Sequence, residues 1–340
     1  MSRYRLLLST SLALVLSAAL ACAEEFVVMP ALPGKPPIPA DNPMTAEKIA
    51  LGKQLYFDPR LSFTGKVSCN TCHNLRTGGV DHKVLSTGAL GKIARRSTPS
   101  VFNAAFQSVQ FWDGRADSIE VAVKDHLTDP TIMGMPTPKV VVAHIQSIPA
   151  YSKQFHKVFR NGQALSYDNI AKAIAAYVRT LITPNSAFDR YVKGDKQALS
   201  AQALRGMREY DSVGCTACHF GTNFSGPPVP MGEGFYELFP NYLGSQYDQQ
   251  YHLVTADQGR YEATGEAIHK RLFHVPSLRT AALTAPYFHT GSVPTLEEAV
   301  RVMAKTQLQK DLSDQQVADI VAFLNSLVGE IPEEKMPALP

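Results

Sequence analysis

Two stretches of the chain carry the same pattern: Cys69-Asn-Thr-Cys72-His73 and Cys215-Thr-Ala-Cys218-His219. This C-x-x-C-H arrangement is the attachment pattern of c-type haem, because the two thiols add across the porphyrin vinyl groups and the next histidine then lies under the iron. A disulfide or a redox-active dithiol would explain the cysteines but not both histidines. The sequence therefore predicts two covalent haems, attached through Cys69, Cys72, Cys215 and Cys218, with His73 and His219 as the proximal iron ligands.

The remaining cysteine, Cys22, lies in an N-terminal segment with the pattern of a secretory signal peptide. Residues 1–23 combine a basic start, an apolar run and the small residues Ala21 and Ala23 at the expected cleavage site. The alternative is a lipoprotein signal ending at Cys22, although Ala19 stands where such a signal has leucine. We therefore expect an exported, periplasmic protein in which the other four cysteines hold haem. No other stretch is long and apolar enough to predict a membrane span.

The composition of the 340 residues excludes several classes of protein. Apolar residues make up 45% of the chain and charged residues 19%, which excludes collagen-like, coiled-coil and wholly disordered chains. The formal net charge of +3 is too small to indicate nucleic-acid binding. The chain is long enough for two modest domains, each with a buried core.

An internal repeat supports a two-domain arrangement. The two C-x-x-C-H motifs are 146 residues apart, and the same shift places residues 176–181 on residues 322–327. Both segments belong to stretches with the apolar spacing of an amphipathic helix. The later helix begins with Ser313-x-x-Gln316, a capping-box pattern. A looser match precedes each motif, where Ala50-Leu51 aligns with Ala203-Leu204.

We expect a mostly α fold with two cytochrome c-like haem domains in tandem and long loops, because no segment shows the alternation typical of a strand. The proline-rich residues after the signal peptide are expected to form either an extended arm on the surface or a loose tail. Pro184 ends the first terminal helix and marks a boundary. The predicted organisation is a signal peptide over 1–23, an arm over 24–43, an N-terminal haem domain over 44–183, a C-terminal haem domain over 184–328 and an irregular tail over 329–340.

Several strings outside the haem motifs resemble a known family. They occur in order within residues 44–328, and they are Gly78-Gly79-Val80-Asp81, Val101-Phe102-Asn103-Ala104, Phe111-Trp112-Asp113-Gly114-Arg115-Ala116, Pro276-Ser277-Leu278-Arg279, Leu283-Thr284-Ala285-Pro286-Tyr287-Phe288-His289-Thr290-Gly291 and Leu296-Glu297-Glu298-Ala299-Val300-Arg301-Val302-Met303. Together with the haem motifs, they make the chain similar to the bacterial di-haem cytochrome c peroxidases. This superfamily also contains the MauG-like enzymes, which oxidise protein tryptophans.

The resemblance implies roles for four residues near the haems. Met303 would be the second ligand of the C-terminal haem, where Met/His ligation raises the potential and suits the haem to accepting electrons. Trp112, the sole tryptophan, would carry electrons between the two haems. Arg115 and Arg279 would pair with haem propionates, which are otherwise costly buried anions.

The resemblance also implies a calcium site between the domains. Thr284 and Pro286 match the positions whose backbone carbonyls bind calcium in relatives. Ser97 stands where the family has an asparagine ligand, so the ligand set here is altered. Calcium takes about six to eight oxygen ligands, several of which are often water.

The sequence departs from the family on the distal side of the N-terminal haem. Ala89 stands where many members have a histidine that caps the iron, so we expect a five-coordinate or water-bound haem, with His82 as the alternative ligand. Ile132 and Ala122 replace the family's distal glutamate and glutamine. Neither can move the proton that peroxide cleavage requires, whereas the nearby His126 could, because imidazole titrates near neutrality. The alternative is that His126 is a surface or capping residue.

Three functions follow from the resemblance and the departures. The first, which we expect, is a periplasmic peroxidase that reduces hydrogen peroxide to water with electrons from a small cytochrome c or cupredoxin. These electrons would enter at the haem of His219 and Met303. The second is MauG-like oxidation of a protein or organic substrate, and the third is a non-catalytic di-haem electron-transfer protein with a degenerate peroxidase pocket. Relatives are often dimers, so a homodimer is expected by analogy only.

Overall fold

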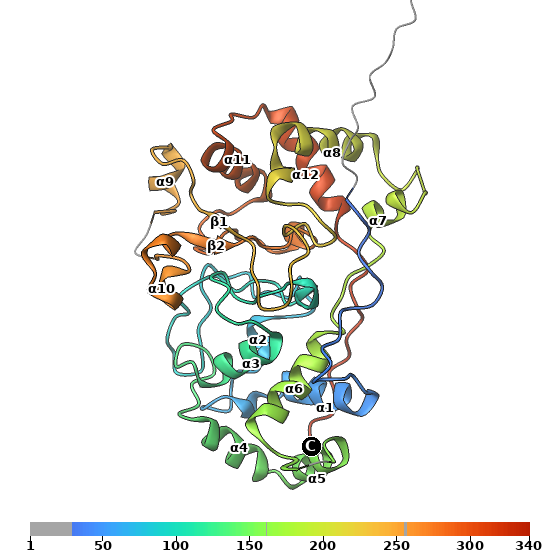
Figure 1. Cartoon of the computed structure of the whole chain (residues 1–340), viewed down its shortest axis with the longest axis vertical. Coiled ribbons are helices and arrows are strands. Elements are labelled where there is room, and N and C mark those ends of the chain that lie inside the picture. The colour runs from blue at the N-terminus through green and yellow to red at the C-terminus, as the bar shows by residue number, and fades with distance from the viewer. Residues whose placement is uncertain (1–28, 161, 255–256) are drawn as a thin grey trace, which may run out of the picture.

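The computed structural model describes residues 29–160, 162–254 and 257–340, so the predicted signal peptide lies outside the described residues. The chain forms two helical halves stacked along the long axis of the molecule (Figure 1). The predicted mostly α fold is confirmed. Within the described part of the chain, no helix is long and apolar enough to cross a membrane.

The N-terminal half contains six helices within the described residues, and the C-terminal half contains six more and a two-stranded antiparallel sheet. The N-terminal helices are α1 (Ala46–Phe57), α2 (Cys69–Cys72), α3 (Ile119–Thr128), α4 (Pro138–Gln146), α5 (Pro149–Val158) and α6 (Tyr167–Val178). The C-terminal elements are α7 (Ala187–Val192), α8 (Ala201–Val213), β1 (Tyr236–Leu238), α9 (Gln246–Gln250), α10 (Tyr261–Thr264), β2 (Leu272–His274), α11 (Leu296–Leu308) and α12 (Asp314–Ser326).

Each half has its own hydrophobic core. The first core draws on residues 51–181, and the second draws on Met29 and residues 188–327. A third cluster includes Phe239 and Val302 of the C-terminal half, and Trp112 of the N-terminal half packs against it. Trp112 therefore belongs by sequence to one half and by packing to the other.

Helix starts coincide with side chains that cap them. The Ser166 hydroxyl accepts a hydrogen bond from the backbone N–H of Asn169 at the start of α6. Ser313 and Gln316 form the predicted capping box at the start of α12. Such caps satisfy backbone N–H groups that have no partner within the helix.

One glycine in each half allows two helices to touch. A Cβ on Gly52 of α1 would lie 1.8 Å from the Ala173 carbonyl oxygen of α6, and a Cβ on Gly206 of α8 would lie 1.7 Å from the Asp319 carbonyl oxygen of α12. Ala173 and Asp319 are 146 residues apart, which is the spacing of the predicted repeat. The two helix pairs are therefore equivalent, and a side chain larger than glycine would force them apart.

The structure corrects the alignment of the helix that precedes each motif. The predicted match of two Ala-Leu pairs implies a shift of 153 residues, whereas the contacts pair Gly52 with Gly206, a shift of 154. The tyrosines four positions later follow the same register. The Tyr56 hydroxyl donates to the His73 carbonyl and the Tyr210 hydroxyl donates to the His219 carbonyl, both at 2.6 Å. The register is set by these contacts, which involve residues distant in the sequence.

The two ends of the described chain cross from one half to the other (Figure 1). Met29 is buried in the C-terminal core, and the backbone N–H of Leu32 donates to Asp189 Oδ1 at 2.9 Å. The C-terminal tail, which has no regular secondary structure, runs the other way, and Gln54 of α1 donates to the Ala338 carbonyl at 3.0 Å. The N-terminal segment thus packs on the C-terminal half, and the C-terminal tail packs on the N-terminal half.

Candidate functional site

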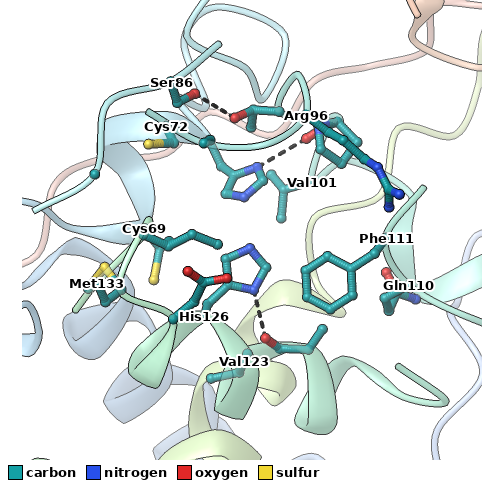
Figure 2. A pocket seen from close by; sticks show the side chains of 18 of the residues that line it. Cys69, Cys72, Ser86, Arg96, Val101, Gln110, Phe111, Val123, His126 and Met133 are labelled. Atoms are coloured by element: carbon teal, nitrogen blue, oxygen red, sulfur yellow. Dashed lines mark hydrogen bonds between the residues drawn. The ribbon is translucent and has the colours of Figure 1, made fainter. Parts of the chain in front are cut away.

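The first C-x-x-C-H motif opens onto a cavity of about 320 Å³ in the N-terminal half. Its walls come from the motif, from residues 94–101 and from helix α3 (Figure 2). The lining residues from the motif and α3 include Cys69, Cys72, His73, Ala122, Val123 and His126. The structure therefore brings both thiols, the following histidine and His126 to one site.

The four thiols of the two motifs are free rather than paired in disulfides. Burial raises the pKa of Cys69 and of Cys215 to about 12, and that of Cys218 to about 11. A redox-active dithiol requires a thiol whose pKa is lowered. The disulfide and dithiol alternatives therefore lose support, and the thiols are placed for attachment of a group in the cavity.

His73 has the orientation of a metal ligand. Its Nδ1 lies 3.1 Å from the Pro99 carbonyl oxygen, an arrangement that leaves Nε2 for a metal. The hydroxyl of Tyr56 holds the backbone of His73. Burial lowers the pKa of His73 to about 4, and the neighbouring His126 makes a smaller contribution in the same direction. The imidazole is therefore neutral at neutral pH, and the neutral form is the one that binds a metal.

The side chains of Ala122 and Ile132 are apolar. Both residues line the cavity, and neither side chain can donate or accept a proton. Ala89 lies outside the lining, and its N–H donates to the Ile132 carbonyl at 2.7 Å. His82 is exposed and its Nδ1 lies 2.7 Å from the Ala285 carbonyl oxygen of the C-terminal half. The alternative of His82 as a replacement ligand is therefore wrong, because that side chain is turned to another part of the molecule.

His126 projects from α3 into the cavity (Figure 2). Its Nδ1 donates to the Ala122 carbonyl at 2.6 Å. Its ring stacks on Phe111 with centres 5.0 Å apart, and its centre lies 5.9 Å from the ring centre of His73. Burial lowers the pKa of His126, so the imidazole is neutral and can accept a proton. The ring faces the cavity, and its Nδ1 also bonds a carbonyl of the last helical turn, so the proton-transfer role of His126 stays a prediction.

Phe111 was not predicted as a site residue. Its φ of 71° lies in the left-handed region, where an aromatic residue is strained. The guanidinium carbon of Arg115 lies 3.5 Å from the centre of the ring that stacks on His126. The signal in the sequence was its place directly before Trp112, but that place does not reveal which way the ring points.

Charged side chains line the same cavity. Arg115 lies 3.1 Å from Asp113, and Arg96 bridges Asp113 and Asp257 at 2.5 and 2.6 Å. Because Asp257 belongs to the C-terminal half, Arg96 ties the two halves together beside the cavity. Arg115 and Arg96 both line the cavity. The propionate partner predicted for Arg115 stays a prediction, and Arg96 is already paired with two carboxylates.

The second motif opens onto a cavity of about 250 Å³ in the C-terminal half. His219 Nδ1 lies 3.2 Å from the Phe224 carbonyl oxygen, and burial lowers the pKa of His219. Met303 of α11 lines the same cavity. The structure therefore brings a thioether and a neutral imidazole to one site, and their pairing as iron ligands stays a prediction.

A short backbone segment separates the two cavities. Residues Ser97–Ser100 line both of them. The Pro99 carbonyl faces His73 Nδ1, and the Ser97 carbonyl accepts a hydrogen bond from Trp112 Nε1 at 2.8 Å. Trp112 itself lines the second cavity. This position fits the predicted role of Trp112 in electron transfer, which no contact tests directly.

His289 is a second site residue that was not predicted. It lines the second cavity, is 3% exposed, and stacks on Phe273 with ring centres 4.3 Å apart. Among the described residues its Nε2 has no hydrogen-bond partner. A buried polar atom without a partner is costly. His289 Nε2 therefore fits a cavity in which a bound group supplies the missing partner.

Arg279 contacts other groups of the C-terminal half. Its fully buried guanidinium is outside the lining of the second cavity, and it donates to Asp189 Oδ1 at 2.6 Å and to the Thr222 carbonyl at 2.7 Å. Asp189 already pairs with this charge, and the propionate partner of Arg279 stays a prediction. Thr284 and Pro286 line the second cavity. The described residues contain no His, Cys, Asp and Glu cluster that could hold a metal ion, and calcium stays a prediction.

Comparisons with known proteins point to one family. The family model for di-haem cytochrome c peroxidase matches residues 46–197. The chain is 42% identical over 300 residues to the cytochrome c551 peroxidase of Pseudomonas aeruginosa, covering 88% of this chain and 84% of that protein. This chain belongs to the di-haem cytochrome c peroxidase family.

The same family includes relatives with a different name. The chain is 32% identical over 322 residues to the methylamine utilization protein MauG of Methylorubrum extorquens, covering 91% of this chain and 86% of that protein. Among solved structures, a MauG-like protein associated with microbial copper homeostasis matches with a TM-score of 0.76 and 28% identity, covering 89% of this chain and 95% of that one. The predicted di-haem peroxidase and MauG superfamily is confirmed.

Membership of the di-haem peroxidase family implies two c-type haems, and both cavities fit this cofactor. Each cavity has two thiols beside an imidazole whose Nδ1 meets a backbone carbonyl. The second cavity also has the unpaired Nε2 of His289. The residues that would hold the haems are Cys69, Cys72 and His73 in the first cavity, and Cys215, Cys218, His219 and Met303 in the second.

Proposed function

We propose that this di-haem peroxidase is exported to the periplasm and reduces hydrogen peroxide to water with electrons from a small cytochrome c or cupredoxin. The observation that carries the proposal is the neutral imidazole of His126 in the first cavity, close to His73. It supplies a proton-transfer group where Ala122 and Ile132 have none. The name of the Pseudomonas aeruginosa relative supports peroxide as the substrate class.

The reaction consumes one hydrogen peroxide, two electrons and two protons, and it yields two waters. A bound haem supplies the iron that takes peroxide and delivers electrons to it. His126 Nε2 accepts a proton from one peroxide oxygen and returns it to the other, which leaves as water. The hydrogen bond from Nδ1 to the Ala122 carbonyl keeps Nε2 aimed into the cavity.

Electrons are proposed to enter at the C-terminal site. Met303 and His219 line that cavity together, and Met/His ligation raises the potential of a haem. Trp112 lies between this cavity and the wall that carries the Pro99 carbonyl beside His73, so it is the proposed relay. The homodimer and the calcium ion implied by the resemblance stay predictions, which the molecular mass and metal content of the purified protein test.

A turnover assay on the oxidised holoprotein tests the function. With hydrogen peroxide and a reduced donor cytochrome c we expect turnover, and His126→Ala should lower kcat/KM by about 10²–10⁴-fold, the usual contribution of acid–base help. His156→Ala is the matched control, because His156 Nδ1 meets the Ser152 carbonyl in the same way on an exposed helix face. A lasting spectral change with poor turnover would favour the MauG-like alternative, and no spectral reaction would contradict both enzymatic functions.

A further inference from the structure

The two imidazoles of the first cavity have the spacing of two ligands on one metal. The ring centres of His73 and His126 are 5.9 Å apart. A ligating imidazole nitrogen lies about 2 Å from its metal, which places the ring centre roughly 3 Å away. Two such rings on opposite sides of a metal therefore have centres roughly 6 Å apart. At this spacing a water or a peroxide could reach the iron only after the His126 ring had moved away from His73.

The ring nitrogens of both histidines are arranged as in metal ligands. His73 Nδ1 meets the Pro99 carbonyl and His126 Nδ1 meets the Ala122 carbonyl, so Nε2 is the nitrogen left for a metal in each ring. Histidines that bind metals nearly always donate their other ring N–H to such an acceptor. The bond alone does not identify a ligand, because the exposed His156 makes the same one. What distinguishes His126 is that its ring shares a cavity with His73 at ligand spacing.

The surroundings of His126 hold it at this spacing. Its ring is stacked on Phe111, and helix α3 is anchored to α6 by the pair of Glu120 and Arg179 at 2.6 Å, in which the Arg179 side chain is 3% exposed. His126 is therefore carried by a helix packed on the core. The methyl side chain of Ala89 cannot bind a metal, and its backbone N–H donates to the Ile132 carbonyl.

We propose that His126 is the second axial ligand of the haem at Cys69, Cys72 and His73 in the resting protein, which makes this haem six-coordinate with two histidine ligands. The proposal rests on the proposed function only in that a haem fills this cavity. It replaces the five-coordinate state expected from Ala89. Small molecules, peroxide included, would then compete with His126 Nε2 for one position, and His126 would have to move away before it could act as the proton carrier.

Electron paramagnetic resonance of the oxidised holoprotein tests the ligand. We expect two low-spin ferric signals and no high-spin signal in the wild type. In His126→Ala one low-spin signal should give way to a high-spin signal, and added imidazole should restore it. His156→Ala should keep both low-spin signals. A high-spin signal in the wild type, or two low-spin signals retained in His126→Ala with both haems attached, would overturn the proposal.

Cyanide binding to the wild type gives a second test that needs no variant. If His126 must leave first, the binding rate reaches a plateau as the cyanide concentration rises, whereas a rate that stays linear overturns the proposal. These measurements distinguish failure of the peroxidase proposal from failure of the His126 ligand proposal. Low-spin spectra without peroxide turnover refute the peroxidase function alone, and a high-spin wild type with full turnover refutes the ligand alone.

Discussion

The two haem cavities are held by the same contacts and differ in what faces the proximal histidine. In both, a tyrosine hydroxyl holds the histidine carbonyl and a glycine lets two helices touch. In the first cavity His126 of α3 lies near His73, and in the second Met303 of α11 lines the same cavity as His219. The repeat therefore shares the means of holding a haem, and the difference in chemistry lies in the opposite wall.

The two cavities also differ in how many charged side chains line them. Apart from histidines, the second cavity has one ionisable acidic or basic side chain of the Asp, Glu, Lys and Arg types in its lining, Glu237. Several line the first, namely Arg95, Arg96, Asp113, Arg115, Asp129 and Glu262. Polarity and solvent access control both the potential of a metal site and the movement of protons to it. The difference supports the proposal that the first site handles protons and substrate and the second passes electrons.

The largest effect should come from removing one pair of cysteines at a time. Replacing Cys69 and Cys72 by serine, or Cys215 and Cys218 by serine, should each leave one covalent haem per chain, because each pair holds its own cofactor. Haem absorbance in pyridine and the mass of the denatured chain measure this. Both variants should lose peroxide turnover, and a variant that keeps two covalent haems would disprove the assignment.

The next effect should distinguish the groups that face the two proximal histidines. Met303→Ala should lower the potential of one haem by on the order of 0.1 V, within the roughly 0.8 V range that axial ligands span. A potentiometric titration of the haem absorbance measures it. An unchanged pair of potentials would remove Met303 from the ligand set and would leave the two sites alike.

The shared helix contact can be tested in each half separately. Gly52→Ala and Gly206→Ala should each lower the free energy of unfolding by about 3 kcal/mol, because a Cβ would meet a backbone carbonyl of the partner helix. Alanine is otherwise the better helix former, so a gain would contradict the contact. Gly34→Ala is the control, because nothing lies within 4 Å of its Cβ position. Chemical denaturation of the holoprotein measures all three.

The smallest effect concerns the acid sensitivity of the junction between the halves. The pKa of Asp257 is lowered. Burial by itself would raise this pKa, but the hydrogen bonds and charge of Arg96 outweigh the effect of burial. A carboxyl with a lowered pKa stabilises the folded state above its unfolded pKa of about 3.9, and this contribution is lost as the pH falls through the folded value.

Asp257→Asn should therefore cost about 1 kcal/mol at pH 7, and the cost should shrink below about pH 4. Unfolding curves of the wild type and the variant from neutral to acidic pH measure the difference. A cost that stays the same at every pH would mean that the charge of Asp257 does not link the halves.

Residues that act with their immediate neighbours were predictable from the sequence. The haem motifs were predictable because the two thiols and the following histidine attach one group within five consecutive positions. The capping box of Ser313 and Gln316 was predictable because its hydrogen bonds span one helical turn. The contact between Arg279 and Asp189 could not be predicted, because the two residues lie 90 positions apart and no local pattern connects them.

The sequence by itself determined the two haem motifs, the helical repeat and the family, because covalent chemistry and helical periodicity are properties of short segments. Only the tertiary structure decided which side chains meet across the cavities. It placed His82 and Arg279 against other partners and brought His126 close to the ring of His73. It also buried His289 Nε2 without a hydrogen-bond partner among the described residues. Helices packed against each other at fixed register set those distances, and that packing depends on contacts between residues far apart in the chain.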